Sequence, residues 1–247
     1  MLRIYYTAIR NFFRFMGALK TMEDMTELSK TRPEEFNEKV RYGYVQYVID
    51  VMMKTGRITT KAYGKENLPE TGGYMMYANH QGKWDAYGII ASHKEPCTFV
   101  MDVKKSNFVF IRQLVDILYA KRLAKDNNRQ AMTIINEVVN DVKEGKKYIF
   151  FPEGKYDTKR KNEMGEFRSG SFKACSKSKV PMVPVAIIDS YKVYNTCSLK
   201  PVTSEVHFLE PICYEEYKDL TTRQMADLVK SRIEEKIKEV EESRKSK

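Results

Sequence analysis

Residues 127–144 carry apolar side chains at helical spacing, and this predicted helix leads into a short apolar segment at 148–151. The apolar positions of the helix are Ala131, Ile134, Ile135, Val138, Val139 and Val142. Gly145 can end the helix, because glycine readily adopts the left-handed conformation that follows a helix C-terminus. Another apolar segment, 116–122, precedes the helix and reads as a short strand. A strand–helix–strand unit connects parallel strands, so the sequence predicts an α/β fold with a mostly parallel central sheet flanked by helices.

Other segments fit this fold. Strands are predicted at 57–63, 74–77, 98–102 and 204–208, with a short helix at 85–92 and a C-terminal helix from Thr221. The segment 180–188 is also apolar, but Pro181 and Pro184 place it at a sheet edge or a bulge, since proline cannot donate a ladder hydrogen bond. A chain of 247 residues can bury the core of one such domain with a small appendage.

One of the three histidines, His80, follows the predicted strand 74–77, and Asp85 stands five residues later. A carboxylate that binds one imidazole nitrogen orients the ring and makes the other nitrogen a better base for an alcohol proton. Five residues of regular helix would turn the two side chains apart, so the pair needs an irregular turn, which Gly82 permits. The alternative interpretation is a surface histidine near an aspartate that caps a helix.

A second motif follows a second predicted strand, because the apolar segment 148–151 ends at FPEG, residues 151–154. Two further stretches stand with it: NHxxxxD, from Asn79 to Asp85, and VPMVPVAI at 180–187. Together these motifs resemble those of glycerolipid acyltransferases of the 1-acylglycerol-3-phosphate acyltransferase (PlsC) type. They occur in the family's order, and the resemblance covers about residues 64–211.

The resemblance implies roles for individual residues. His80 would be the catalytic base, and Asp85 would orient it. Arg122 matches the arginine with which the family binds the substrate's phosphate, and Lys105 matches a basic position after the preceding strand. Arginine suits this role because its planar guanidinium group forms two parallel bonds with phosphate oxygens.

The FPEG motif would shape the pocket for glycerophosphate, through the carboxylate of Glu153 and the turn at Gly154. Here the sequence departs from its relatives, because FPEG is commonly followed by Thr and Arg, whereas this chain has Lys155 and Tyr156. The candidates to replace the missing positive charge are Lys155, Arg160 and Arg168. This departure leaves open an acceptor other than the usual lysophosphatidate.

The implied reaction transfers a fatty acyl group from a thioester of coenzyme A or acyl carrier protein to the sn-2 hydroxyl of 1-acylglycerol-3-phosphate, forming phosphatidic acid. Backbone amides near Gly82 are candidate donors to the oxyanion. No metal or redox cofactor is expected, because thioester cleavage is favourable. Two alternatives stay open: a related acyltransferase with another acceptor, such as glycerol-3-phosphate or a different lysolipid, and a non-catalytic basic membrane-binding protein.

The first 20 residues predict an amphipathic helix, with Arg3, Arg10 and Arg14 clustered beside its apolar face. Such a helix suits a bilayer interface with its arginines toward lipid phosphates; the alternative is a helix packed on its own domain. Residues 23–32 read as a polar connection and 33–56 as a second helix. By resemblance, residues 1–56 would seat the protein peripherally on the cytoplasmic face of the cell membrane, and 57–247 would form the acyltransferase domain.

The formal net charge of +10 favours anionic partners: a membrane surface, a lysophospholipid substrate or an acidic acyl carrier protein. Nucleic acid is not expected, since the chain has no clustered basic helix or aromatic RNA-binding signature. The four cysteines lack CxxC spacing, so we expect reduced thiols and no zinc site. Of the remaining histidines, His93 is expected to be solvated at a helix end and His207 to be packed in a strand.

Overall fold

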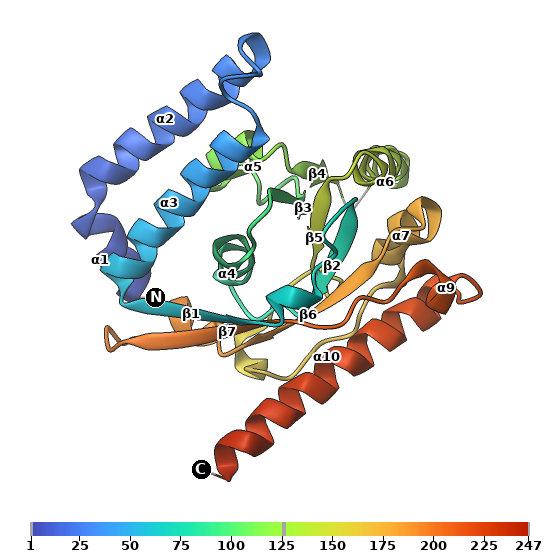
Figure 1. Cartoon of the computed structure of the whole chain (residues 1–247). Coiled ribbons are helices and arrows are strands. Elements are labelled where there is room, and N and C mark those ends of the chain that lie inside the picture. Colours follow the sequence, from blue (N-terminus) through green and yellow to red (C-terminus); the bar gives the residue numbers. More distant parts are fainter. Residues whose placement is uncertain (1, 125–126, 247) are drawn as a thin grey trace.

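The computed structural model describes residues 2–124 and 127–246, which contain a seven-stranded sheet with helices on both faces (Figure 1). The strand order is β1-β7-β6-β2-β5-β3-β4. Neighbouring strands are parallel except β6 and β7, which are antiparallel. The predicted α/β fold with a mostly parallel sheet is confirmed.

Strands and helices alternate along most of the chain after the N-terminal helices. The strands are β1 (Ile58–Tyr63), β2 (Tyr74–Ala78), β3 (Cys97–Asp102), β4 (Lys121–Leu123), β5 (Lys147–Phe150), β6 (Met182–Ile188) and β7 (Val202–Phe208). The α-helices are α1 (Leu2–Arg10), α2 (Phe12–Thr31), α3 (Glu38–Gly56), α4 (Asp85–Ser92), α5 (Ile111–Ile117), α6 (Asn128–Lys143), α7 (Lys173–Ser178), α8 (Tyr191–Asn195), α9 (Tyr214–Tyr217) and α10 (Thr222–Lys245).

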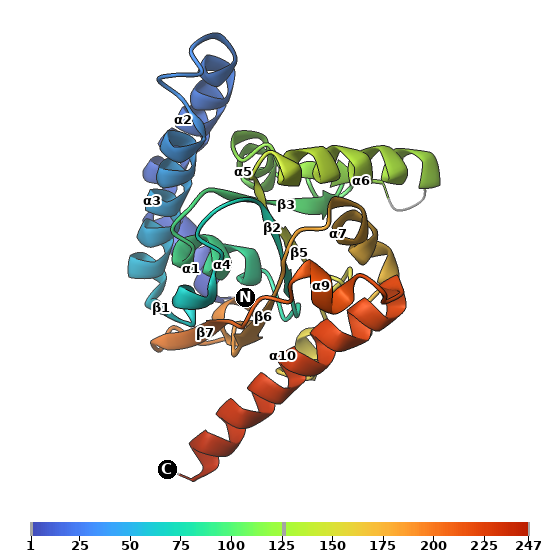
Figure 2. The ribbon, with the colours of Figure 1, turned by 45° about the vertical axis from the view of Figure 1, so that its right-hand side comes forward.

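The central strand β2 is buried on both faces. Tyr74, Met76 and Ala78 pack into the core under α3 and α4, whereas Met75 and Tyr77 pack into the core under α6, α7 and α10 (Figure 2). This alternation follows from the two-residue period of a strand, and a strand covered on both faces reads as a continuous apolar run. The carboxyl end of β2 therefore lies between those of β5 and β6, and the residues that follow it are fixed by the middle of the sheet.

Strand β6 lies inside the sheet, so the expected edge position is wrong and the alternative, a bulge, is present. Met182 bridges to Ile212, and Val185 pairs with Phe208. The three residues 209–211 therefore lie opposite the two residues 183–184 of β6. Pro184 stands in this irregular stretch, where its carbonyl oxygen accepts a bond from the backbone N–H of Leu209 at 3.0 Å. The extra residue accommodates a proline that has no N–H to donate.

The strand predicted at 116–122 is wrong over most of its length. Residues 111–117 form helix α5, and the strand β4 begins only at Lys121. The buried apolar residues of this region are Leu114, Val115, Ile117 and Leu118. Their spacing is helical, and the helix was missed because the expected segment began at Asp116, in the last turn of α5.

The N-terminal helix is longer than predicted and is broken once. Helix α1 ends at Arg10, α2 begins at Phe12, and α2 continues through the polar stretch expected to be a connection. Helices α2 and α3 then run side by side as a hairpin (Figures 1 and 2). The polar residues belong to the exposed face of α2: Lys20 pairs with Asp24 at 2.6 Å. No helix in the described part of the chain is long and apolar enough to cross a membrane.

Two basic or titratable side chains expected near solvent are buried. Arg3 is 1% exposed, and its guanidinium donates to the carbonyl oxygens of Gly56, Val193 and Lys200, so it does not face lipid. His93 is also 1% exposed and contacts the Tyr74 hydroxyl at 2.5 Å. Burial lowers the pKa of His93. The acceptors of Arg3 lie 53 to 197 residues away in the sequence, whereas His93 bonds to Tyr74, 19 residues before it, and to the carbonyl oxygen of Glu95.

Candidate active site

His80 and Asp85 are in contact at the carboxyl end of β2. His80 Nδ1 lies 2.7 Å from Asp85 Oδ2, and the irregular turn between β2 and the first residue of α4 brings the two side chains together. The His80 side chain is 20% exposed, whereas that of Asp85 is fully buried. Because Nδ1 faces the carboxylate, Nε2 is the nitrogen that can serve as a base. The geometry suits general-base chemistry, and the catalytic roles of both residues stay predictions.

The Asp85 carboxylate is held by more than the imidazole. Its Oδ2 accepts the backbone N–H groups of Gln81 at 2.6 Å and Gly82 at 2.9 Å, and its Oδ1 accepts the hydroxyl of Ser190. These donors stabilise the ionised form in a place where water is excluded. The amides near Gly82 are thus directed at Asp85, which argues against their predicted use as oxyanion donors. A side chain at Gly82 would also approach Asn195 Nδ2 to 2.9 Å.

Glu153 joins the FPEG turn to the turn that carries the histidine. Its two carboxylate oxygens accept the backbone N–H of His80 at 2.8 Å and of Gly165 at 2.9 Å. The residue is 9% exposed, and burial raises the pKa of Glu153 although both amides favour its ionised form. Gly154 adopts a φ of +69°, which favours glycine. In this arrangement Glu153 positions the protein backbone, while its predicted contact with substrate stays a prediction.

Aromatic rings define the surroundings of the imidazole. The His80 ring stacks on Phe151 at a centroid distance of 4.4 Å and meets the edge of Tyr156 at 4.9 Å. Lys105 Nζ lies 5.7 Å from the centroid of the Tyr156 ring. Tyr156, which stands where relatives commonly have arginine, therefore connects the candidate base with one of the two candidate phosphate-binding residues.

Arg122, the other residue predicted to bind phosphate, contacts the loop that carries Lys105. Arg122 Nε donates to Ser106 Oγ at 3.2 Å, and its Nη2 pairs with Asp116 at 2.6 Å. Arg122 therefore contacts the loop after β3 at the residue next to Lys105. Lys155 is exposed.

The other two candidates to replace the missing arginine lie against the FPEG region. A Cβ atom added to Gly154 would lie 3.3 Å from Arg168 Cζ, and one added to Gly165 would lie 2.9 Å from Arg160 Nη1. Of these candidates, Arg168 is the one whose guanidinium packs against the turn at Gly154. Which of these residues binds substrate stays a prediction.

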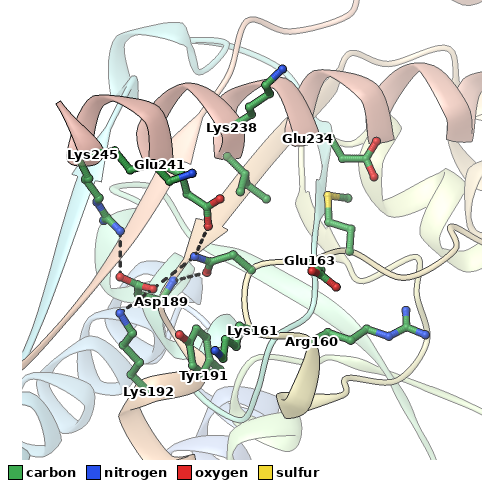
Figure 3. A pocket seen from close by; sticks show the side chains of 14 residues that line it. Arg160, Lys161, Glu163, Asp189, Tyr191, Lys192, Glu234, Lys238, Glu241 and Lys245 are labelled. Carbon is green, nitrogen blue, oxygen red and sulfur yellow. Dashed lines mark hydrogen bonds and ion pairs between the residues drawn. The ribbon is translucent and has the colours of Figure 1, made fainter.

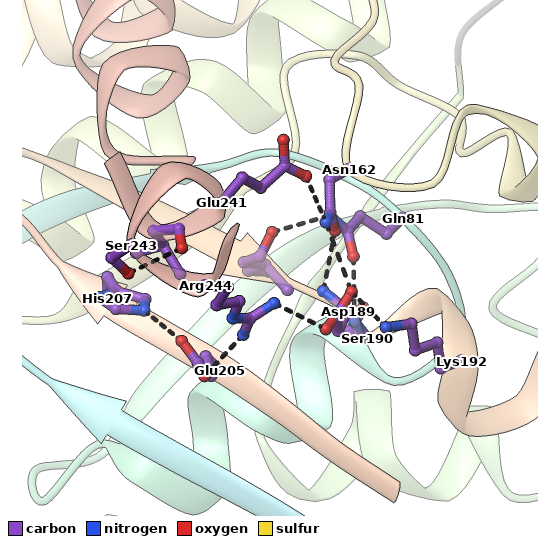
Figure 4. Close-up of polar contacts among 12 residues, drawn as sticks. Gln81, Asn162, Asp189, Ser190, Lys192, Glu205, His207, Glu241, Ser243 and Arg244 are labelled. Atoms are coloured by element: carbon purple, nitrogen blue, oxygen red, sulfur yellow. Dashed lines mark hydrogen bonds and ion pairs between the residues drawn. The ribbon is translucent and has the colours of Figure 1, made fainter. Parts of the chain in front are cut away.

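Sequence reasoning missed two residues beside the dyad: Ser190, which follows β6, and Gln81, in the turn after β2. Ser190 and Gln81 are both buried, and Gln81 Oε1 accepts the backbone N–H of Ser190 at 3.0 Å (Figure 4). A signal for Ser190 was present, because it follows the motif at 180–187 by three residues. Neighbouring parallel strands end at the same edge, so the end of this strand belongs beside His80. Within the described residues, no cluster of His, Cys, Asp and Glu suits a metal ion.

Comparison with known proteins agrees with these features. A family model described as acyltransferase matches residues 59–188. A probable 1-acyl-sn-glycerol-3-phosphate acyltransferase of Mycoplasma pneumoniae is 25% identical over 64% of the chain and 60% of its own length. The Saccharomyces cerevisiae 1-acyl-sn-glycerol-3-phosphate acyltransferase is 24% identical over 74% of the chain and 61% of its own length. These alignments thus span about three fifths of the two relatives.

The alignments with two further proteins cover a larger share of those proteins. The Escherichia coli 1-acyl-sn-glycerol-3-phosphate acyltransferase is 29% identical over 69% of both chains. The crystal structure of the 1-acyl-sn-glycerophosphate acyltransferase PlsC from Thermotoga maritima superposes with a TM-score of 0.76, at 17% identity and 96% coverage of both chains, which shows a shared fold. The resemblance inferred from three motifs is confirmed. Because the family model spans more than half of its residues, this chain belongs to the acyltransferase family.

Proposed function

We propose that the protein transfers a fatty acyl group from an acyl thioester to the sn-2 hydroxyl of 1-acylglycerol-3-phosphate, forming phosphatidic acid for phospholipid biosynthesis. The observation that carries this proposal is the buried Asp85 carboxylate at 2.7 Å from His80 Nδ1, which leaves Nε2 of a partly exposed imidazole as the base. The names of the relatives from yeast and Escherichia coli support the choice of acceptor.

The mechanism needs one proton carrier. His80 Nε2 accepts the proton of the sn-2 hydroxyl as the oxygen attacks the thioester carbonyl carbon, and Asp85 stabilises the imidazolium that forms. The tetrahedral intermediate collapses, the carbon–sulfur bond breaks, and the imidazolium returns the proton to the leaving thiolate. A thiol and an ester are released, and the imidazole is neutral again. The thioester can come from coenzyme A or from acyl carrier protein, and no further cofactor is part of the scheme.

The acceptor's phosphate binds to Arg122 and Lys105 in this proposal, with Lys155 as an additional cation. Arg122 supplies a planar pair of donors, and Asp116, which now pairs with it, holds the guanidinium in place. Glu153 and Gly154 shape the wall of the pocket next to His80. Holding the hydroxyl near the base converts an encounter between two molecules into a reaction within one complex.

A thiol-release assay tests the proposal. We expect wild-type protein in mixed micelles to release thiol from acyl-coenzyme A or acyl carrier protein thioesters only when lysophosphatidate is added. His80→Ala should abolish this release, whereas the control variant His207→Ala should retain it, because His207 lies on β7 and bonds to Glu205 at 2.9 Å. A fully active His80→Ala, or no thioester consumption with any lysolipid, would falsify the assignment.

The two residues after FPEG favour a second candidate for the acceptor. Tyr156 and Lys155 replace the residues that commonly follow FPEG, and the Tyr156 ring lies between Lys105 and the imidazole. Glycerol-3-phosphate or another lysolipid is the acceptor that this change would favour. Initial rates with an acceptor panel decide the matter: lysophosphatidate should give the highest kcat/KM, and a higher value with another lysolipid would replace it.

The proposal includes peripheral attachment to the cytoplasmic face of the membrane through the N-terminal helices. Around the junction of α1 and α2, large apolar side chains are exposed: Tyr5, Ile9, Phe12, Phe13 and Met16. Arg10 and Arg14 are exposed beside them, as a surface that contacts lipid phosphates requires. Flotation with anionic liposomes tests this part, and Phe13→Glu should move the protein into the unbound fraction. Equal flotation of the variant would exclude this surface.

A further inference from the structure

A series of hydrogen bonds connects the loop after FPEG with the candidate base. Figure 4 shows its part from Asn162 through Gln81 to Ser190. Gln81 Nε2 donates to Asn162 Oδ1 at 3.0 Å, and Gln81 Oε1 accepts the backbone N–H of Ser190 at 3.0 Å. The Ser190 hydroxyl donates to Asp85, whose other oxygen faces His80 at 2.7 Å. Five residues are thus linked: four of them through their side chains alone, and Ser190 through its backbone N–H on one side and its hydroxyl on the other.

Asn162 is the residue at which this series meets the C-terminal helix. Its Oδ1 also accepts the backbone N–H of Asp189 at 2.9 Å. Its Nδ2 donates to Glu241 Oε1 of α10 at 2.9 Å and to Asp189 Oδ1 at 3.4 Å. Two acceptor sites and two donor hydrogens are all used, and only an amide side chain offers both kinds at once.

Asp189 and the end of α10 hold this arrangement in place. Asp189 has a φ of +63°, and its carboxylate binds Arg244 at 2.9 Å and Lys192 at 2.9 Å. The Arg244 guanidinium also reaches Glu205 of β7 at 2.7 Å. Asp189, Lys192 and Arg244 border a pocket of about 650 Å³ between the loop at 160–164 and α10 (Figure 3). The polar series therefore runs from a solvent-facing pocket to a fully buried carboxylate.

We infer that Asn162 is a positioning residue for the His80–Asp85 pair. By fixing the amide of Gln81 it keeps the Ser190 hydroxyl directed at Asp85, and the carboxylate in turn holds the imidazole with Nε2 toward the substrate. The inference rests on the proposed acyl transfer at His80. Small displacements of reacting groups caused by distant substitutions lower turnover strongly, so the effect belongs in kcat and not in KM.

The test compares Asn162→Asp with Asn136→Asp. The first replaces both donor hydrogens with a charge that faces Asp189 and Glu241. The second is the same chemical change on the exposed face of α6, where an aspartate can keep the bond to Lys177 that Asn136 makes at 3.1 Å. We expect Asn162→Asp to lower kcat about 10- to 100-fold with KM within threefold of wild type, and Asn136→Asp to match wild type.

Two readouts separate positioning from a general loss of stability. Adding Glu241→Gln to Asn162→Asp supplies an amide donor and removes one charge, so kcat should recover at least threefold. The NMR signal of the proton on His80 Nδ1, bonded to Asp85, should shift in Asn162→Asp and not in Asn136→Asp. If Asn162→Asp does not fold, Asn162→Ala carries the same comparison without added charge.

The outcomes are distinct. An unchanged kcat and an unchanged His80 signal in the Asn162 variants overturn the inference while leaving the acyltransferase assignment intact. A shifted signal in a protein that consumes no thioester with any acceptor supports the positioning role and overturns the proposed function. A fall in kcat that Glu241→Gln does not reverse, with an unmoved His80 signal, also counts against the inference, because a loss of stability explains it.

Discussion

The loop after β2 and the loop after β3 leave the same edge of the sheet but are built differently. In the first, every polar side chain from Asn79 to Gln81 has a partner, and Asn79 bonds to both the N–H and the C=O of Ile187 at 2.7 and 2.9 Å. In the second, Phe108 and Val109 are 67% and 75% exposed. The proposed reacting groups are thus held by many hydrogen bonds, while the side proposed to bind the acceptor exposes large apolar side chains.

This difference predicts which kinetic constant each loop controls. Substitutions in the rigid turn should lower kcat, because they disturb groups that act in the transition state. Substitutions on the open side, which comprises the loop after β3 and the neighbouring Asp116 and Arg122, should raise KM. They remove binding that the ground state and the transition state share.

The largest effect is expected for Asp85→Asn. Asp85 Oδ2 binds His80 Nδ1 and the backbone N–H groups of Gln81 and Gly82, while Oδ1 accepts the Ser190 hydroxyl. An asparagine amide keeps an acceptor at only one of these two positions and carries no charge, so the imidazolium loses the carboxylate that stabilises it. We expect kcat to fall by about 10³- to 10⁴-fold, as for other carboxylates that orient a catalytic histidine. Thiol release under saturating acceptor measures it.

The matched control is Asp116→Asn, the same chemical change at a carboxylate on the open side. Asp116 pairs with Arg122 at 2.6 Å and is 38% exposed at its side chain. Its substitution should change KM for the acceptor and leave kcat within about threefold. Equal losses of kcat in the two variants would remove the distinction between the two loops.

Glu153→Gln tests the support that the FPEG turn gives to the backbone of His80. Its effect on kcat should be intermediate. One glutamine oxygen can accept only one of the two backbone N–H groups, and its NH₂ group repels the other. The backbone of His80 or of Gly165 then loses its partner, and kcat should fall by about 10- to 100-fold. A variant in which KM rises while kcat is unchanged would instead identify Glu153 as a substrate-binding residue.

The stability of Glu153→Gln has a defined dependence on pH. Burial raises the pKa of Glu153 in the folded protein, so the folded state binds the proton more tightly than the unfolded state. The free energy of unfolding of wild type therefore falls, relative to the variant, as pH rises from the ordinary glutamate value through the raised one. Urea unfolding of both proteins at pH 4 and pH 7 measures it; a wild type that gains stability relative to the variant contradicts the sign.

Much of this arrangement could be predicted from local patterns, and the rest depends on distant contacts. The central sheet follows from apolar runs, and His80 and Asp85 meet because they stand five residues apart on one turn. Ser190 meets Asp85, Asn162 meets Gln81 and Arg3 meets Val193 across 105, 81 and 190 residues, and nothing in their immediate sequence marks them.

Pro184 shows the same limit in the backbone. Its missing N–H indicated an edge or a bulge, but only the pairing of β6 with the segment 208–212 decides between the two. Sequence periodicity identifies which residues face a core, and it does not say which strand will lie beside them.

Arg122→Ala should have the smallest effect and should change KM alone. The guanidinium is held by Asp116 and Ser106 on the open side, so its loss should remove the proposed contact with phosphate without moving the imidazole. We expect KM for lysophosphatidate to rise about 10-fold, with kcat within threefold, since a hydrogen bond to a charged group contributes about 1.5–3 kcal/mol. Arg129→Ala, on the exposed surface of α6, removes the same charge as a control and should leave KM unchanged. If both variants raise KM equally, general attraction of the anionic acceptor explains the result. If Arg122→Ala lowers kcat with KM unchanged, the open side takes part in the chemical step, and the contrast between the two loops fails.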